Sequence, residues 1–135
     1  MVEKRVLVVD GALFRDKKIL LGKRPLSKNA FPGLWELPGG HVEEGETPEK
    51  ALEREFLEEL GIKVQVLREI HSFSYFSAGV EKKVLVFLVK QVGFEPLKAF
   101  DHDELRWVSE GELASLPVSD EERAAVTVGF KNLPG

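Results

Sequence analysis

Residues 47–61 read TPEKALEREFLEELG and give the clearest prediction of a helix in the chain. Thr47 has the side chain of an N-cap residue, and Pro48 suits the first helical position because it needs no backbone N–H there. Gly61 is placed to end the helix in a left-handed conformation. We therefore expect a helix over Thr47–Leu60.

Three carboxylates share one face of this helix. On a wheel of about 100° per residue, Glu59 falls roughly 40° to one side of Glu55 and Glu58 roughly 60° to the other. This acidic face borders an apolar stripe that predicts burial, formed by Leu52, Phe56 and Leu60. Like charges at these spacings repel, and a bound divalent cation would remove the repulsion. Oxygen ligands favour Mg²⁺ or Mn²⁺ over Ca²⁺ for phosphate chemistry, and a merely solvated acidic face is the alternative.

The segments that flank the helix predict strands. Arg5–Phe14 and Lys18–Lys23 are apolar runs joined by a short turn, which indicates a hairpin. Leu34–Leu37 predicts a short strand that the sequence Pro38-Gly39-Gly40 brings to an end. Three further strands are expected at Lys63–Phe76, Lys82–Val92 and Glu104–Val108.

The C-terminal region predicts two more helices. Ser109 with Glu112, and Ser119 with Glu122, have the spacing of capping boxes. The order is then three strands, a helix, three strands and two helices, without regular strand–helix alternation. This order favours an α/β (α+β) fold with a mixed β-sheet flanked by helices.

Composition limits the classes of function. The chain has 135 residues, which predicts a single domain over residues 1–135. It has no cysteine, which excludes disulfides, thiolate metal sites and cysteine nucleophiles. A net charge of −4 makes it a poor binder of nucleic-acid polymers. No apolar run is long enough for a membrane span and no secretion signal is recognisable, so we expect a cytoplasmic protein.

The acidic helix belongs to a longer pattern over residues 40–62. Gly40 is followed after five residues by Glu46, and after seven more by REFLEELGI at residues 54–62. This pattern resembles the Nudix box, Gly-x5-Glu-x7-Arg-Glu-U-x-Glu-Glu-x-Gly-U, in which U is a bulky apolar residue, and every fixed position matches. The resemblance implies a hydrolase of nucleoside diphosphates linked to another group X, with an α/β/α sandwich around a mixed β-sheet.

The resemblance also implies roles for individual residues. Arg54 and Glu46 would form an ion pair that fixes the loop–helix–loop of the box, and the Gly40 carbonyl would assist in metal binding. The implied metal ligands are Glu55, Glu58 and Glu59. Some members of the family take one more carboxylate from a late loop, for which the candidates are Asp101, Asp103 and Glu104. Glu55 or that late carboxylate would accept the proton of the attacking water.

Several residues outside the box are candidates for substrate contact. Arg24, at the end of a predicted strand, could reach a phosphate, or be an ordinary surface charge. Five aromatic residues could stack on a nucleobase, although each taken singly is more often a core residue: Phe31, Trp35, Phe73, Tyr75 and Phe76. His102 is interpreted as an ordinary loop histidine.

The substrate prediction rests on a closer resemblance to the MutT-type branch. That branch hydrolyses nucleoside triphosphates, including oxidised deoxynucleotides, to a monophosphate and pyrophosphate. The alternatives are hydrolysis of ADP-ribose or another nucleotide-sugar, and a non-catalytic nucleotide-sensing domain. Members of the family are often dimers, so the resemblance admits a homodimer.

Overall fold

A long central strand, β1 (Arg5–Arg15), organises the fold. The structure is a computed structural model that describes residues 5–135. Strand β1 is followed along the chain by β2 (Lys18–Lys23), β3 (Trp35–Glu36), β4 (Gly39–His41), α1 (Pro48–Leu60), β5 (Lys63–Ser77), β6 (Val80–Val92), β7 (Glu104–Val108), α2 (Glu110–Leu113) and α3 (Asp120–Lys131). Every helix and strand that the sequence predicts is present, with ends that differ by no more than two residues.

The strands within the described residues form one mixed sheet of seven, in the order β3-β2-β1-β6-β5, with β4 added to β1 and β7 to β2. β1 and β6 run parallel, from Arg5 beside Glu81 to Leu13 beside Val89. The other pairings are antiparallel, including the long hairpin of β5 and β6. The mixed sheet predicted from the order of elements is therefore confirmed.

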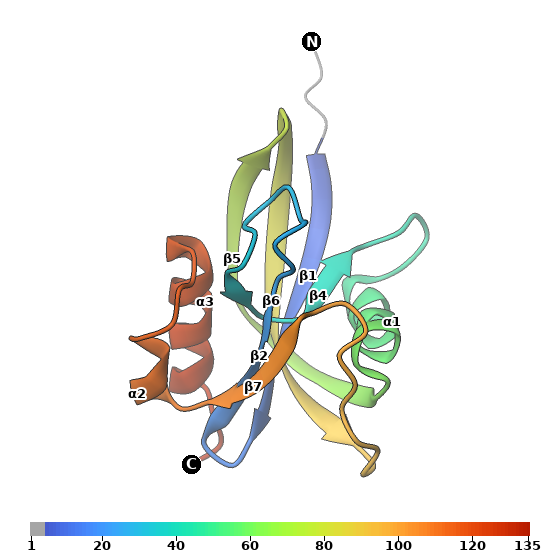
Figure 1. Cartoon of the computed structure of the whole chain (residues 1–135). Helices are drawn as coiled ribbons and strands as arrows, with labels where there is room; N and C mark the ends of the chain where they lie inside the picture. The colour runs from blue at the N-terminus through green and yellow to red at the C-terminus, as the bar shows by residue number, and fades with distance from the viewer. Residues whose placement is uncertain (1–4) are drawn as a thin grey trace.

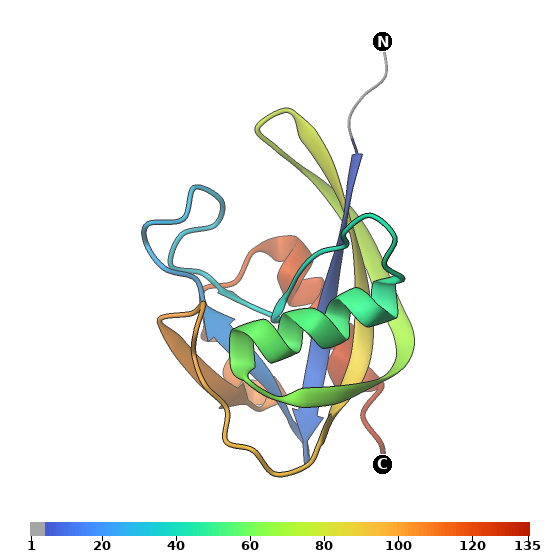
Figure 2. The same cartoon turned by 90° about the vertical axis from the view of Figure 1, so that its right-hand side faces the viewer.

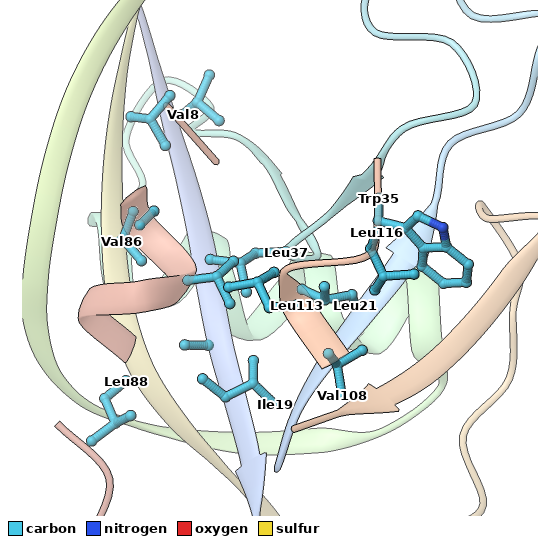
Figure 3. Close-up of a cluster of buried hydrophobic side chains, with 14 residues drawn as sticks. Val8, Ile19, Leu21, Trp35, Leu37, Val86, Leu88, Val108, Leu113 and Leu116 are labelled. Carbon is cyan, nitrogen blue, oxygen red and sulfur yellow. The ribbon is translucent and has the colours of Figure 1, made fainter. Parts of the chain in front are cut away.

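Helices cover both faces of this sheet, with α1 on one side and α2 and α3 on the other (Figure 1). Alternate residues of β1 serve the two sides. Val9 and Leu13 pack with Leu52 and Phe56 of α1, and Val8 and Ala12 belong to the opposite cluster. Figure 3 shows that second cluster. It joins the sheet to the C-terminal helices through Val8, Ile19, Leu21, Trp35, Leu37, Val86, Leu88, Val108, Leu113 and Leu116. The architecture is thus the α/β/α sandwich that the sequence resemblance implies.

One strand was not predicted. Pro38-Gly39-Gly40 predicts the end of a strand, but Gly39–His41 forms β4 and pairs with β1, where Asp10 lies opposite Gly39. A Cβ atom at Gly39 would lie 2.0 Å from the Val9 carbonyl oxygen. The glycine therefore permits a close approach of two backbones, which is a role that its turn propensity conceals.

The second predicted capping box is only half formed. The Ser119 hydroxyl accepts a hydrogen bond from the Glu122 N–H at 3.3 Å, as expected for an N-cap. The Glu122 carboxylate instead accepts the N–H of Leu37 at 2.9 Å. This long-range hydrogen bond draws Glu122 into the interior beside the sheet, whereas the box at Ser109 and Glu112 is complete.

Candidate functional site

Local sequence places helix α1 as predicted. The Thr47 hydroxyl accepts the N–H of Lys50 at 3.2 Å, and Pro48 occupies the first turn. Gly61 ends the helix at a φ of 70°, which favours glycine over residues that carry a Cβ atom. Figure 2 shows α1 lying across its face of the sheet. The apolar stripe that includes Phe56 is fully buried against that face.

The three box glutamates on α1 differ sharply in burial. Glu59 is only 4% exposed. The side chain of Glu55 is 16% exposed and that of Glu58 is 57% exposed. The acidic face thus passes from solvent to core over one turn of helix, as the helical wheel predicts.

Glu59 is the least well satisfied of these carboxylates. Burial is the largest cause that raises its pKa, to about 10, and hydrogen bonding and charge from Glu55 add to the increase. Its Oε2 atom has no hydrogen-bond partner among residues 5–135. A buried carboxyl group without a cationic partner is costly, and a nearby cation would relieve that cost.

Arg54 ties the acidic helix to the loop before it. Its Nε donates to Glu46 Oε2 at 2.8 Å and its Nη2 to Glu46 Oε1 at 3.0 Å, so the ion pair is bidentate. Nη2 also donates to the His41 carbonyl at 3.0 Å. Nη1 donates to Glu55 Oε1 at 3.0 Å and to Glu58 at 3.2 Å. The ion pair implied by the resemblance is therefore present, and it extends to two of the helix carboxylates.

The contacts of Arg54 also shift the pKa values of the two members of the Arg54–Glu46 ion pair. The hydrogen bond from Arg54 is the largest cause that lowers the pKa of Glu46, and the reciprocal bond raises the pKa of Arg54. Both groups are charged at neutral pH, and a bidentate geometry of this kind fixes orientation as well as distance.

Gly40 lies directly against Glu55. A Cβ atom at position 40 would be 2.4 Å from Glu55 Cδ. Only glycine leaves room for the Glu55 carboxylate in this position. Strand β4 and helix α1 are therefore in close contact at Gly40 and Glu55.

The donors around this point fit a divalent cation. The buried, unpartnered oxygen of Glu59 is adjacent to Glu55, and the close approach of Gly40 brings a backbone segment beside the carboxylates. Oxygen donors of this kind suit Mg²⁺ and Mn²⁺. In the part of the chain from Arg5 onward, no three acidic or histidine side chains already converge as a chelating group. The exposed Glu58 carboxylate is turned towards Arg54 instead.

The late loop between β6 and β7 packs on the end of α1. The N–H of Phe100 donates to the Glu59 carbonyl at 3.1 Å and that of Lys98 to Leu60 at 3.0 Å. Among the late-loop candidates, Asp101 is the one whose charge raises the pKa of Glu59. Glu104 pairs with Arg106 on the exposed side of β7. Of the three candidates, Asp101 is therefore the one whose charge acts on the box.

A cavity of about 190 Å³ lies beside the box, between the sheet and the start of α3. Five of the six substrate-contact candidates line it: Arg24, Phe31, Trp35, Phe73 and Tyr75. The sixth, Phe76, is 68% exposed near the end of β5 and does not line this cavity. Phe31 and Tyr75 meet edge to face with ring centres 5.4 Å apart. Trp35 is largely buried, and the guanidinium of Arg106 stacks on its ring. Gly40 and His41 also line the cavity, which therefore adjoins the acidic helix.

The cavity wall contains acidic residues that the sequence analysis did not select. Asp10 is only 8% exposed and lines the cavity. Burial and the charge of Glu122 raise its pKa well above the usual value. Burial likewise raises the pKa of Glu122 to about 8. A lone aspartate in the apolar run of β1 was the available signal, whereas Glu122 was assigned to a helix cap.

Arg24 does not project freely into the cavity. Its Nη1 donates to Glu36 at 3.1 Å, and its Nε donates to the Ala30 carbonyl at 2.7 Å. Glu36 in turn contacts His102 Nε2 at 3.0 Å. His102 was interpreted as an ordinary loop histidine, but its side chain is only 3% exposed. His102 does lie in a loop, but its burial was not predicted: the ring occupies space that Gly22 leaves open.

Among the described residues, no helix is both long and apolar enough to cross a membrane.

Comparisons with known proteins cover most of the chain. A family model described as the NUDIX domain matches residues 4–128. An ADP-ribose pyrophosphatase of Methanocaldococcus jannaschii is 34% identical over 93% of this chain and 75% of that protein. A CTP pyrophosphohydrolase of Escherichia coli K12 is 35% identical over 86% of this chain and 84% of that protein.

Solved structures show the same fold. A crystal structure of a MutT NUDIX hydrolase from Burkholderia pseudomallei superposes with a TM-score of 0.81 at 28% identity. The match covers 93% of this chain and 98% of that chain.

Proposed function

The chain belongs to the Nudix hydrolase family, and from this premise we propose that it hydrolyses a nucleoside diphosphate linked to a group X in a reaction that requires Mg²⁺ or Mn²⁺. One observation carries the proposal. Gly40 both lines the aromatic cavity and packs on Glu55, so a nucleotide whose base enters the cavity has its phosphates beside the box glutamates.

Glu55, Glu58 and Glu59 are the residues that would hold the cation, with the Gly40 carbonyl beside them. When bound, the cation neutralises phosphate charge and increases the acidity of an attacking water. Asp101 is the late-loop carboxylate best situated to join this set, because its charge acts on Glu59.

The protein's own residues position the substrate and accept a proton. Glu55 or Asp101 accepts the proton of the attacking water. Arg54 holds Glu55 and Glu58 in place from its anchor on Glu46. Attack at phosphorus displaces the other half of the anhydride directly, so we expect no covalent enzyme intermediate.

The aromatic cavity supports a nucleotide substrate. Phe31, Phe73 and Tyr75 offer ring faces and edges on which a planar base can pack. We infer that the base enters this cavity and that the phosphates extend from it past Gly40 towards α1. We propose a nucleoside triphosphate or an oxidised deoxynucleoside triphosphate as substrate, with a monophosphate and pyrophosphate as products. The relative from E. coli K12 that is named as a CTP pyrophosphohydrolase supports this choice.

ADP-ribose or another nucleotide-sugar is the second candidate. The relative from M. jannaschii, named as an ADP-ribose pyrophosphatase, supports it at 34% identity over 128 residues. A non-catalytic nucleotide sensor is disfavoured because every fixed position of the Nudix box is present and Arg54 and Glu46 are paired.

A nucleotide panel separates these candidates. The protein is incubated with each of the four common nucleoside triphosphates, 8-oxo-dGTP and ADP-ribose, with Mg²⁺ or Mn²⁺, and products are identified by phosphorus NMR. Pyrophosphate with a nucleoside monophosphate supports the first proposal, and AMP with ribose 5-phosphate supports the second. Nucleotide binding without turnover would favour the sensor.

The setting of the reaction is also proposed from sequence. The net charge of −4 favours a free nucleotide over a nucleic-acid polymer. We propose a single catalytic domain that acts in the cytoplasm, as a monomer or homodimer, and sedimentation analysis would distinguish the two assemblies.

A further inference from the structure

A buried histidine lies in a loop that contacts both the acidic helix α1 and the residues of the cavity wall. His102 belongs to the loop between β6 and β7, and its side chain is 3% exposed. A Cβ atom at Gly22 would lie 2.5 Å from His102 Cγ, so the ring packs directly on strand β2. This close fit restricts the ring to one place and makes it more than a surface loop residue.

The ring makes one specific polar contact. His102 Nε2 and Glu36 Oε2 are 3.0 Å apart, and because a carboxylate accepts, Nε2 carries the hydrogen. Nδ1 has no hydrogen-bond partner in the described part of the chain. Within the described residues, the ring therefore has one hydrogen-bond partner, which is the carboxylate of Glu36.

Glu36 passes this constraint on to a cavity loop. Its two carboxylate oxygens accept hydrogen bonds from Arg24 Nη1, Oε1 at 3.1 Å and Oε2 at 3.3 Å. Arg24 Nε then donates to the Ala30 carbonyl at 2.7 Å, one residue before the cavity residue Phe31. Backbone hydrogen bonds from Arg24 to Leu34 and from Gly33 to Arg24 close the same loop.

The other end of the connection is fixed to the acidic helix. Backbone N–H groups of Lys98 and Phe100 donate to the Leu60 and Glu59 carbonyls at the end of α1. The N–H of Asp103 donates to the Lys23 carbonyl at 3.0 Å. Figure 2 shows this loop running beside that end of α1. His102 is thus held on both sides by anchored backbone.

We propose that His102 is a positioning residue that fixes Glu36, Arg24 and the 25–34 loop as one wall of the substrate cavity. The proposal rests on the proposed function for its kinetic form, because that function assigns the cavity to the nucleotide. A preordered loop lowers the entropy that substrate binding must overcome, so loss of the contact affects KM more than kcat.

The rival role is support for the neighbouring acids. Asp101 and Asp103 flank His102, and a ring that merely shaped their loop would affect catalysis at the cation instead of affinity. The two roles differ in which kinetic constant changes and in which substitutions restore it.

Two amides provide a matched pair of variants. The nitrogen of a glutamine side chain lies as many bonds from Cα as His Nε2 does, whereas that of asparagine corresponds to Nδ1. Since Nδ1 has no partner and Nε2 holds Glu36, H102Q retains the contact and H102N loses it. H102L removes both nitrogens.

Steady-state kinetics on the best nucleotide of the panel tests the proposal. We expect H102N and H102L to raise KM about ten-fold, the loss of roughly one charge-assisted hydrogen bond, with kcat changed by less than about two-fold. H102Q should remain within about three-fold of wild type in KM. In an E36Q background, H102L should add little further, because the two residues act in one chain of contacts.

The contrary results are equally distinct. A fall in kcat at unchanged KM would assign His102 to the neighbouring acids and overturn the proposal. Equal behaviour of H102N and H102Q would overturn it as well, since the contact with Glu36 would then be irrelevant.

A second measurement remains decisive if the protein hydrolyses none of the nucleotides. Amide hydrogen exchange of Gly33, whose N–H donates to the Arg24 carbonyl at 3.0 Å, reports the order of the loop directly. Exchange at Gly33 should be faster in H102N than in wild type and H102Q. Unchanged exchange would contradict the positioning role, whereas absent turnover with the expected exchange would contradict only the proposed function.

Discussion

Glu55 and Glu59 lie one turn apart on α1, and the carboxyl group of Glu59 is almost completely buried within reach of the charge of Glu55. Two like-charged groups this close favour retention of a proton by one of them. Ionised Glu59 therefore lowers the stability of the folded protein, and a bound cation or a proton removes this destabilisation.

The first prediction concerns pH. The pKa of Glu59 is raised to about 10 in the folded protein, and the pKa of Glu122 to about 8. The folded state therefore keeps protons that the unfolded chain releases above its ordinary carboxyl pKa. Stability in EDTA should fall as pH rises from 5 to 8, by at most about 1.4 kcal/mol per pH unit for each such group. Thermal unfolding across this range measures it.

Glu59→Gln provides the control for the pH prediction. It removes the ionisable group but keeps nearly the same shape, so the dependence of Tm on pH in EDTA should become shallower. A steeper dependence, or a wild-type Tm that rises from pH 5 to pH 8, would contradict the assigned cost.

The second prediction concerns metal. Mn²⁺ or Mg²⁺ that binds the folded state alone stabilises it according to its concentration relative to Kd. Tm at pH 8 should rise on addition of either cation and return on addition of excess EDTA. The increase should be smaller in Glu59→Gln. An equal increase in both proteins would place the cation elsewhere.

The third prediction separates two glutamates of α1. Glu58→Gln should leave the fold intact and lower kcat about a hundred-fold or more with Mg²⁺ saturating, because a ligand of the catalytic cation is lost. Glu53 lies on the same helix and pairs with Lys50 at 3.6 Å. Glu53→Gln should keep kcat near wild type. Near-normal kcat in Glu58→Gln would refute its role as a metal ligand.

The fourth prediction concerns the close contact of Gly40 with Glu55. A Cβ atom at position 40 would come within 2.4 Å of Glu55 Cδ, and the flexible carboxylate would move in response. Gly40→Ala should therefore lower kcat about a hundred-fold, the usual effect of displacing a catalytic group by about 1 Å. Its unfolding free energy should change by less than about 1 kcal/mol, because the side chain moves and the backbone does not.

Gly111→Ala is the matched control, because a Cβ atom there meets nothing within 4 Å. It should keep full activity and gain a few tenths of a kcal/mol to about 1 kcal/mol as a helical Gly-to-Ala change. Loss of activity in both variants would mean that the glycine substitutions act on the fold as a whole.

Local signals in the sequence were sufficient for the acidic helix. Its start at Thr47, its end at Gly61 and the order of burial of its carboxylates follow from capping and from 3.6-residue periodicity. The strands followed from apolar runs between turn residues. Both kinds of signal act over a few residues, which is why they can be recognised without a structure.

The wall of the cavity depends on long-range contacts. The Glu122 carboxylate accepts the N–H of Leu37, 85 positions away, instead of the Ser119 N–H that the capping pattern predicts. His102 is buried because Gly22 leaves room for its ring. Tertiary contacts of this kind override the hydrogen bonds that local sequence favours. No pattern within a few residues of Glu122 or His102 predicts them.

Alternation along β1 has a consequence for how this protein can diverge. Asp10 lines the cavity on one face of the sheet, and its neighbour Val9 packs beneath α1 on the other. Substitutions at alternate positions of one strand therefore reach separate halves of the site. A substitution on the cavity face can therefore alter which ligand fits while the packing beneath α1 stays unchanged.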